Sequence, residues 1–229
     1  MTKVIPPRAA GARKVAKKRK PEASEGAATG SRREQQKLDK RERIRAAAWE
    51  LFTTVGFDET TTKAVAARAD VAAGTLFLYA RDKVDLLCLV MHARLAEVTE
   101  QRFATLPRTA PLLDQLLHVF RGPFAMYAEH PQLSAAFVRY FPGADGPNGQ
   151  EVGALTFAFL HRLGQLVQGA QGRGEVAADV EPVTAAGNFF WLYYGALMSW
   201  ISGYASNETA LEPGLRNALA LQIRGLAPR

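Results

Sequence analysis

The sequence predicts an all-α protein, and three observations lead to this fold class. Apolar residues recur at intervals of three and four residues in one segment after another, which is the period of a helix buried on one face. No alternation of apolar and polar residues lasts long enough to form a strand. Apolar residues make up 48% of the 229 residues, so the chain can bury the core of one or two domains.

The first strong helical period lies between about Ser31 and Gly56, where the glycine suits the end of a helix. A short second helix follows from Thr62 to Arg68, with Thr61 as its N-cap. Asp70 then stands where the chain has to pass through a left-handed conformation, which aspartate tolerates better than most residues. The apolar stripe of the first helix consists of Ile44, Ala47, Ala48, Leu51, Phe52 and Val55.

A third short helix, from about Ala72 to Tyr79, precedes a long fourth helix that Asp82 caps. Pro111 and Pro131 suit first-turn positions of later helices, whereas Pro123 is expected to break or kink the helix it falls in. We expect a loop at Pro142–Gln150 because of its Gly and Pro content. The stripe of the fourth helix is Val84, Leu87, Val90, Met91 and Leu95, and the last predicted helices are Glu151–Gln171, Val183–Tyr204 and Glu212–Leu226.

The positive charge of the chain is concentrated at its N-terminus. Residues 1–40 hold 12 Lys and Arg but 4 Asp and Glu, a net charge of +8, whereas residues 41–229 carry −1. Seven of these cations lie among small residues between Arg8 and Lys20, so residues 1–33 are predicted to be a disordered basic arm. Such an arm suits binding to nucleic acid or an anionic membrane, although an arm that only keeps the protein soluble has the same composition.

The single cysteine, Cys88, allows no internal disulfide and no cysteine-cluster metal site, so no metal or cofactor is expected. A reducing cytoplasm suits this composition. The first 20 residues lack the apolar core of a secretory signal. The most apolar stretch, Phe189–Ile201, has 13 residues, too few to span a bilayer, and is predicted to be a buried helix. No membrane partner is expected.

Two short helices joined by a tight turn and preceded by a longer helix are typical of a helix-turn-helix. In that unit the second short helix enters the major groove of DNA by its N-terminal end. Gly74 lies near the start of this helix, although glycine costs about 1 kcal/mol against alanine inside a helix. Its missing side chain would let the backbone approach DNA, and the N–H groups of the helix N-terminus would face a phosphate.

The segment RERIRAAAWELFTTVGFDETTTKAVAARADVAAGTLFLYARDKVDLL, Arg41–Leu87, resembles the DNA-binding domain of the TetR family of bacterial transcriptional regulators. The shared features are the AAAWELF helix, Gly56-Phe57, the Thr61 cap, VAARA, GTLFLY and the lysine of RDK. The resemblance implies a repressor, a homodimer that binds a palindromic operator in double-stranded DNA and leaves it when a small molecule binds. It also implies a helix-turn-helix domain over residues 34–88 and an effector-binding and dimerisation domain over residues 89–229.

The resemblance further implies individual DNA contacts. Thr61 and Thr62 would contact phosphates, and Lys63 would reach a phosphate or a base edge. Lys83 would hold a phosphate from the next helix. The groove-facing residues would be Ala73, Gly74, Thr75, Leu78 and Tyr79, and Leu76 would be core. Alternatively, Thr61 is only a cap, Tyr79 only packs, and Lys83 is a solvated charge.

Three positions depart from the family's pattern. Asp70 replaces the usual turn glycine and adds a negative charge near DNA. Ala72 replaces the usual serine cap, so about 1 kcal/mol of capping is missing. Phe77 replaces the phosphate-binding tyrosine and has no hydroxyl. Because the groove-facing residues also include no Arg, Lys, Asn or Gln, the side chains that make bidentate base contacts, we expect the basic arm to supply affinity along the backbone or in the minor groove.

The helix within GNFFWLYYGALMSWISGY is apolar around nearly its whole circumference, which predicts burial on more than one side. The second side would meet a partner subunit, with Gly195, Ala196 and Ser199 allowing close approach, or else the interior of the same chain. Polar groups on otherwise apolar helices are the candidate ligand contacts, although an ordinary core or surface role explains each one better: His118, Tyr127, His161, Gln165, Asn188 and Tyr193.

Two other classes of protein fit the sequence less well. An enzyme is not expected, because the sequence has no Gly-rich phosphate loop, nucleophile elbow or metal-ligand spacing. A nucleoid-type protein would bind DNA through the basic arm without sequence preference. Random competitor DNA at moderate salt distinguishes it from a regulator, which retains its operator.

Overall fold

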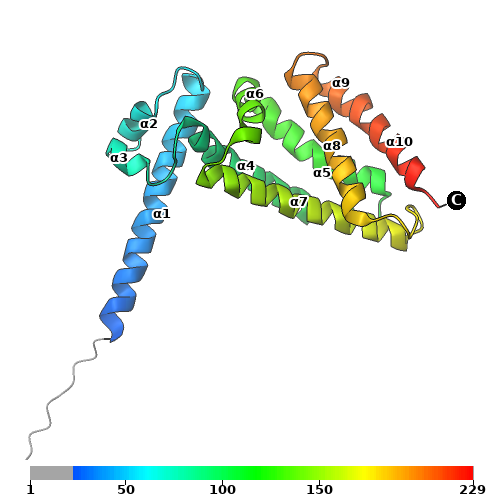
Figure 1. Cartoon of the computed structure of the whole chain (residues 1–229), viewed down its shortest axis with the longest axis horizontal. Coiled ribbons are helices and arrows are strands. Elements are labelled where there is room, and N and C mark those ends of the chain that lie inside the picture. Colours follow the sequence, from blue (N-terminus) through cyan, green and yellow to red (C-terminus); the bar gives the residue numbers. More distant parts are fainter. Residues whose placement is uncertain (1–22, 229) are drawn as a thin grey trace, which may run out of the picture. The chain divides into compact units, whose positions relative to one another are not determined.

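The computed structural model describes residues 23–228, and helices form nearly all of that range (Figure 1). The predicted all-α fold class is confirmed, since no strand occurs among the described residues. The chain divides into one unit that ends at Asp39 and a second that runs from Lys40 to the C-terminus. The core and the candidate sites belong to the second unit.

Helix α1 (Ala23–Thr54) begins earlier than the predicted start at Ser31. The prediction of a disordered arm over residues 1–33 is therefore wrong for residues 23–33, which are helical. The Glu, Gln, Lys and Arg residues that follow Ser31 are good helix formers, and the helix extends upstream from them. The rest of the predicted arm, residues 1–22, lies outside the described residues.

The predicted stripe of α1 is confirmed for Ile44, Ala47, Ala48 and Phe52, all of which are buried. Val55 is exposed, against the prediction, because the helix has already ended at Thr54. Gly56 then takes a φ of +101°, a left-handed conformation in which a side chain would be strained.

Helix α2 (Thr62–Arg68) has the predicted bounds, and the Thr61 hydroxyl accepts a hydrogen bond from the Ala64 amide at 3.1 Å. Helix α3 (Ala73–Leu76) is shorter than predicted, and turns continue from it to Tyr79. Ala72 provides no side-chain cap, which is consistent with so short a helix. Helix α4 (Lys83–Ala104) is capped as predicted, since the Asp82 carboxylate accepts from the Asp85 amide at 2.8 Å.

The C-terminal helices surround one core. Helix α5 runs without a break through Pro123, so the predicted break is wrong, and Pro123 is buried there. The predicted loop Pro142–Gln150 is also wrong at its end, because Pro147 opens α7 in a first-turn position. The elements are α5 (Leu112–Glu129), α6 (Pro131–Tyr140), η1 (Phe141–Gly143), α7 (Pro147–Gly172), α8 (Pro182–Ile201), α9 (Asn207–Thr209), the irregular turn η2 (Ala210–Leu215) and α10 (Arg216–Leu226).

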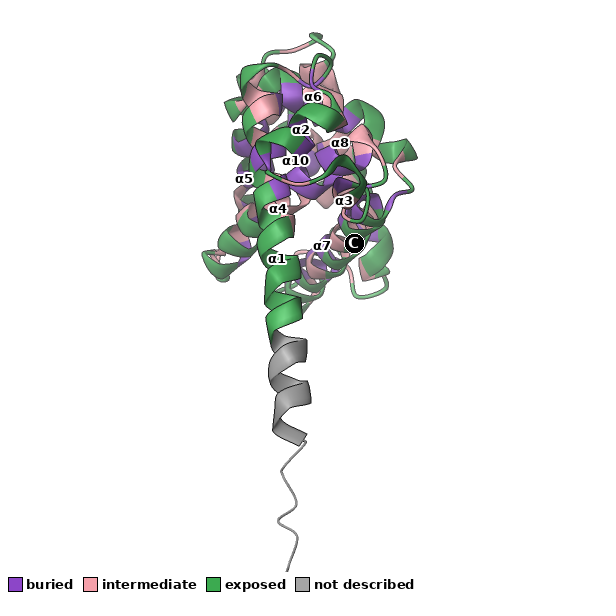
Figure 2. Ribbon diagram, turned by 90° about the vertical axis from the view of Figure 1, so that its left-hand side faces the viewer, coloured by how far each residue is buried: buried purple, intermediate pink, exposed green. Residues whose placement is uncertain are grey.

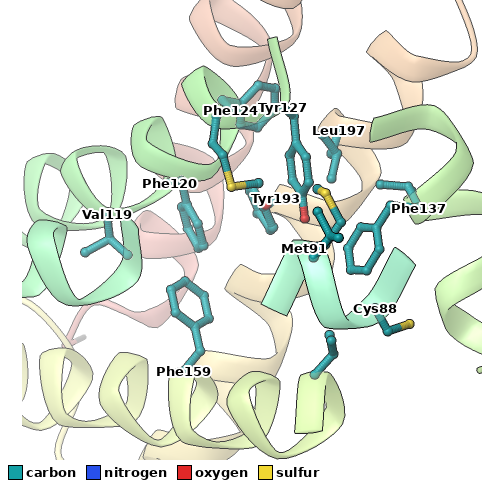
Figure 3. Close-up of a cluster of buried hydrophobic side chains, with 14 of the residues drawn as sticks. Cys88, Met91, Val119, Phe120, Phe124, Tyr127, Phe137, Phe159, Tyr193 and Leu197 are labelled. Carbon is teal, nitrogen blue, oxygen red and sulfur yellow. The ribbon is translucent and has the colours of Figure 1, made fainter. Parts of the chain in front are cut away.

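Buried side chains gather where α4, α5, α7 and α8 pack together, coloured purple in Figure 2. Aromatic rings fill the centre of this core. Phe120 of α5 stacks on Tyr193 of α8 with ring centroids 4.7 Å apart, and Phe159 of α7 lies within 6.1 Å of Phe120 (Figure 3). Among the described helices, none is long and apolar enough to cross a membrane.

The apolar helix α8 is buried on one face and exposed on the other. Phe189, Tyr193 and Leu197 are buried, whereas Trp191 is 66% exposed and Gly195 is also exposed. Burial on every side within one chain, one of the two alternatives, is therefore ruled out. The apolar surface that remains on α8 is unusual for a solvent-facing helix.

Candidate DNA-binding surface and ligand cavity

Helices α2 and α3 meet through a tight turn at Asp70. The Asp70 amide donates to the Ala67 carbonyl at 3.2 Å and the Val71 amide donates to the Ala66 carbonyl at 3.0 Å. Asp70 has a φ of 51°, so the predicted left-handed conformation is confirmed. Its exposed carboxylate lies 3.5 Å from a guanidinium nitrogen of Arg43, an exposed pair that offsets little of the negative charge.

The predicted groove-facing residues are exposed or half-buried. Ala73 and Gly74 are exposed and Thr75 is half-buried. Leu78 is 80% exposed, an unusual position for a leucine. A Cβ atom built on Gly74 meets no atom of the protein within 4 Å. A lack of space inside the protein therefore does not explain why this residue is a glycine. Leu76, predicted as core, is fully buried.

The other residues of the predicted DNA surface are placed as follows. Thr61 and Lys63 are exposed and Thr62 is half-buried, all at the start of α2. Phe77 is 52% exposed. Tyr79 is half-buried, and its carbonyl accepts a hydrogen bond from the Asn148 side chain at 2.8 Å.

Lys83 makes contacts inside its own chain. Its ammonium group donates to the carbonyl oxygens of Phe57 and Asp58, at 2.9 and 2.8 Å, and lies 4.6 Å from the centre of the Phe57 ring. A lysine held in this way fastens the start of α4 to the loop after α1. The alternative of a freely solvated charge is therefore wrong, whereas the phosphate contact stays a prediction.

A cavity of about 80 Å³ lies between α4, α5, α6, α7 and α8 in the C-terminal part of the chain. Its walls are almost entirely apolar, and several of them are aromatic. Leu155, Thr156, Phe190 and Tyr194 are only half-buried, so the cavity borders the surface on that side. Fifteen residues line it: Leu95, Thr99, Pro123, Tyr127, Phe137, Val138, Phe141, Val152, Leu155, Thr156, Phe159, Phe190, Tyr193, Tyr194 and Leu197.

Two of the six predicted ligand contacts line this cavity. Tyr127 and Tyr193 are both buried, and Figure 3 shows both rings within the core. Burial raises the pKa of both hydroxyls, so both phenols stay protonated at neutral pH. They are the polar groups that an apolar ligand with one oxygen atom would meet first.

The other four predicted ligand contacts do not line this cavity, and their role stays a prediction. His118 is bound by its Nε2 to the Arg102 carbonyl at 3.0 Å and to the Thr105 hydroxyl at 3.1 Å. His161 and Gln165 are exposed on α7, with their side chains 3.2 Å apart. Asn188 is exposed on the outward face of α8. Polar residues at helical spacing do not reveal which way the helix faces once several helices surround the core.

Sequence reasoning missed the aromatic wall of the cavity. Phe159, Phe190 and Tyr194 line it, together with the two threonines Thr99 and Thr156. The available signal was the spacing of Leu155, Thr156 and Phe159 at three and four residues on α7. That spacing is shared by every buried helix face, so it predicts burial without predicting a cavity.

The helix-turn-helix and the helical core that follows it define the class of protein: an all-α protein with a helix-turn-helix unit before a larger helical domain that holds an apolar cavity. Residues 44–88 match the model of the bacterial regulatory proteins of the tetR family. Over these residues the chain therefore carries a DNA-binding domain of the TetR type. That family consists of bacterial regulatory proteins.

Two curated relatives carry the same name, HTH-type transcriptional repressor KstR. The one from Rhodococcus jostii is 36% identical over 114 residues, which are 50% of this chain and 53% of the relative. The one from Mycobacterium tuberculosis is 25% identical over 168 residues, 73% of this chain and 74% of the relative. The match therefore spans about half the length of the first relative and three quarters of the second.

Solved structures show the same fold. The Thermus thermophilus repressor FadR, in complex with lauroyl-CoA, superposes with a TM-score of 0.67 at 25% identity, covering 82% of this chain and 96% of that one. A TetR regulator from Rhodococcus sp. RHA1 superposes with a TM-score of 0.64 at 23% identity, covering 84% and 100%.

Proposed function

We propose that this protein is a transcriptional repressor that binds a palindromic operator as a homodimer and leaves it when a small molecule enters the apolar cavity. The observation that carries the proposal is the helix-turn-helix at residues 44–88. Its helix α3 is exposed at Gly74, where a side chain would meet no other atom of the protein within 4 Å. A regulator of this kind acts on DNA in the cytoplasm.

The proposed DNA-binding surface comprises the start of α2 and the outward side of α3. Lys63 supplies its positive charge, and Thr75 can contact a base edge or a thymine methyl group. The exposed leucine side chain of Leu78 suits a thymine methyl as well. The remaining proposed contacts are Thr61, Thr62, Ala73, Gly74, Phe77 and Tyr79. Lys83 stays a predicted contact, although its ammonium group is bound to two backbone carbonyls.

The proposed dimer interface is the outward face of α8 with the neighbouring α10. Trp191 on α8 is 66% exposed and Leu221 on α10 is 65% exposed, and the two helices pack side by side (Figure 1). Two copies of this pair would form a four-helix interface related by a twofold axis. A twofold dimer presents two recognition helices, which is why the operator would be palindromic.

The proposed ligand is a molecule with an apolar body and at least one hydrogen-bonding oxygen. Fatty acyl thioesters are the first class to test, because the Thermus thermophilus relative was crystallised with lauroyl-CoA. At about 80 Å³ the cavity is much smaller than the roughly 300–1,000 Å³ of ordinary ligand pockets. A ligand of this class must therefore push the walls apart, and that displacement would change the shape of the domain.

The test of DNA binding starts from a duplex selected from a random pool by the protein itself. We expect the purified dimer to retain that duplex in the presence of excess random DNA at 150 mM salt, with a specificity ratio of roughly 10³ or more. Thr75→Ala should weaken binding to the selected duplex by about 1–2 kcal/mol. Equal competition by random DNA would instead support the nucleoid-type alternative.

The test of ligand binding uses lauroyl-CoA, with coenzyme A alone as the control for its polar part. We expect lauroyl-CoA to lower the affinity for the selected duplex and coenzyme A to leave it unchanged. Tyr193→Phe removes one hydroxyl of the buried pair and should weaken the response to lauroyl-CoA. A full response to coenzyme A alone would contradict binding in the apolar cavity.

A further inference from the structure

The first turn of α7 is capped by a residue of another helix. The α7 N-cap is Gly146, which has no side chain to offer. The carboxylate of Asp85, in the first turn of α4, takes its place and accepts hydrogen bonds from the amides of Asn148 at 2.9 Å and Gly149 at 3.1 Å. A Cβ atom on Gly146 would come within 2.4 Å of the Asp85 side chain, so the glycine makes room for this cap.

The Asp85 carboxylate is buried, with 1% of the residue exposed. It also accepts from the Arg81 amide at 3.0 Å and from the Asn148 side chain at 3.1 Å, so four neutral donors surround it. The positive end of the α7 helix dipole further stabilises the buried negative charge. Separation of α7 from α4 would leave this charge without three of its four donors, so the two helix starts are expected to move together.

Asn148 extends the connection to the DNA-binding domain. Its side-chain nitrogen donates to the carbonyl of Tyr79 at 2.8 Å, in the segment between α3 and α4. Its side-chain oxygen accepts from Arg41 of α1 at 3.2 Å, and Arg41 also pairs with Glu151 of α7. Asn148 is buried, with 2% of the residue exposed. From this position its side chain contacts α1, α4 and the segment between α3 and α4.

The same helix reaches the cavity directly after this turn. Val152, Leu155, Thr156 and Phe159 of α7 line the cavity, and Val152 is one helical turn from Asn148. A ligand that widens the cavity pushes on these residues. Because helices are stiff along their axes, a shift of α7 there also shifts its first turn.

We infer that Asn148 and Asp85 form the joint that couples the cavity to the helix-turn-helix. Asn148 acts as a positioning residue that transmits a displacement of α7 to Tyr79 and Arg41, while Asp85 keeps the two helix starts together. This inference rests on the proposed release of DNA by a ligand, and it names the residues on which that release depends.

The experiment compares Asn148→Ala with Gln150→Ala. Asn148→Ala removes the side-chain contacts to Tyr79, Arg41 and Asp85. It keeps the backbone amides of Asn148 and Gly149, so the Asp85 carboxylate still caps α7. Gln150 is exposed in the same turn, and its side chain reaches only the Asp145 carbonyl at 3.3 Å, so Gln150→Ala is a matched control. The probes are lauroyl-CoA and a duplex selected by the wild-type protein.

We expect Asn148→Ala to bind lauroyl-CoA within about twofold of wild type, since the cavity is intact. The factor by which lauroyl-CoA weakens duplex binding, typically 5–150-fold in coupled systems, should fall at least fivefold in Asn148→Ala and stay unchanged in Gln150→Ala. An unchanged factor in Asn148→Ala, with lauroyl-CoA still bound, would overturn the joint.

Amide hydrogen exchange in the protein without ligand or DNA gives a second, independent measurement. We expect faster exchange at residues 76–82 in Asn148→Ala than in wild type or Gln150→Ala, because the carbonyl of Tyr79 loses its partner. If lauroyl-CoA has no effect on the wild-type protein, the proposed ligand class fails and the exchange result alone decides on the joint. Equal exchange in all three proteins would then refute it.

Discussion

The ammonium group of Lys83 donates a hydrogen bond to the backbone carbonyl of Phe57 at 2.9 Å and lies over the ring of the same residue at 4.6 Å. One lysine thus closes the helix-turn-helix by joining the start of α4 to the loop before α2. We expect Lys83→Met, which keeps most of the apolar stem, to lower the free energy of unfolding by about 1–2 kcal/mol. Urea unfolding followed by circular dichroism measures this change.

Lys63→Met is the control for this prediction. Lys63 is exposed at the start of α2, so its replacement should leave the free energy of unfolding within about 0.5 kcal/mol of wild type and weaken DNA binding. If the two variants unfold at the same urea concentration, the Lys83 contacts do not stabilise the protein.

Gly74 offers a test of the proposed DNA-binding surface, because stability and DNA binding should not fall together there. A Cβ atom there meets nothing within 4 Å, and Gly74 is not among the positive-φ glycines. Gly74→Ala should therefore leave stability unchanged or raise it by up to about 1 kcal/mol, while duplex binding weakens because the methyl group blocks the approach of DNA. Thermal unfolding and fluorescence anisotropy measure the two effects.

Gly153→Ala supplies the comparison, since this α7 glycine also has open space around it and lies outside the DNA-facing surface. It should gain stability in the same way and bind the duplex normally. Unaltered duplex affinity in Gly74→Ala would place the DNA elsewhere.

The proposed dimer interface is best tested at Gly195. Ala196 packs against the core of its own chain and Ser199 is half-buried, so arginine at either position would disturb the protomer. Gly195 is exposed, and a Cβ atom there meets nothing within 4 Å. We expect Gly195→Arg to yield folded monomers in size-exclusion chromatography with light scattering, because the charge falls in the middle of the proposed interface.

The matched variant is Gly172→Arg, at the exposed and equally open end of α7. It should elute with the mass of a dimer. If the Gly195→Arg protein is still a dimer, the interface does not lie on the outward face of α8.

The basic N-terminal segment gives a prediction about salt. Residues 1–22, which lie outside the described residues, contain eight Lys and Arg but one Glu. Their removal leaves α1 whole and should flatten the plot of log K against log salt by several units, since each phosphate contact contributes about 0.9. Binding to random DNA should weaken almost as much as binding to the selected duplex. An identical salt slope after truncation would leave the segment with a solubilising role.

Because Cys88 is buried, we expect the free energy of unfolding to fall at alkaline pH. Burial raises the pKa of its thiol to about 12, with the charges of Asp85 and Asp82 acting in the same direction. Above the ordinary thiol pKa of about 8.5 the unfolded chain loses this proton and the folded chain keeps it, so stability falls as pH rises toward 12. The slope due to Cys88 is at most about 1.4 kcal/mol per pH unit.

Cys88→Ala isolates this contribution, because Tyr127 and Tyr193 titrate in the same direction in both proteins. The free energy of unfolding of the wild type should fall more steeply above pH 9 than that of Cys88→Ala. Parallel curves would show that the thiol does not contribute.

The sequence by itself determined the features that depend on neighbours within a few residues. The bounds of α2, the caps at Thr61 and Asp82 and the left-handed turn at Asp70 were all predicted correctly. Each of these results from backbone propensity or from a side chain that bonds to the next turn of its own helix. The order of residues therefore contains all the information that they need.

The tertiary structure alone decided which partner each long-range side chain finds. Asp85 caps a helix that starts more than 60 residues later in the chain, and Lys83 binds carbonyls that lie about 25 residues before it. The same packing left Tyr127 and Tyr193 in the cavity and turned His118 and Asn188 away from it. Helical periodicity predicts that a face is buried, but which helices cover it depends on how residues far apart in sequence pack around one core.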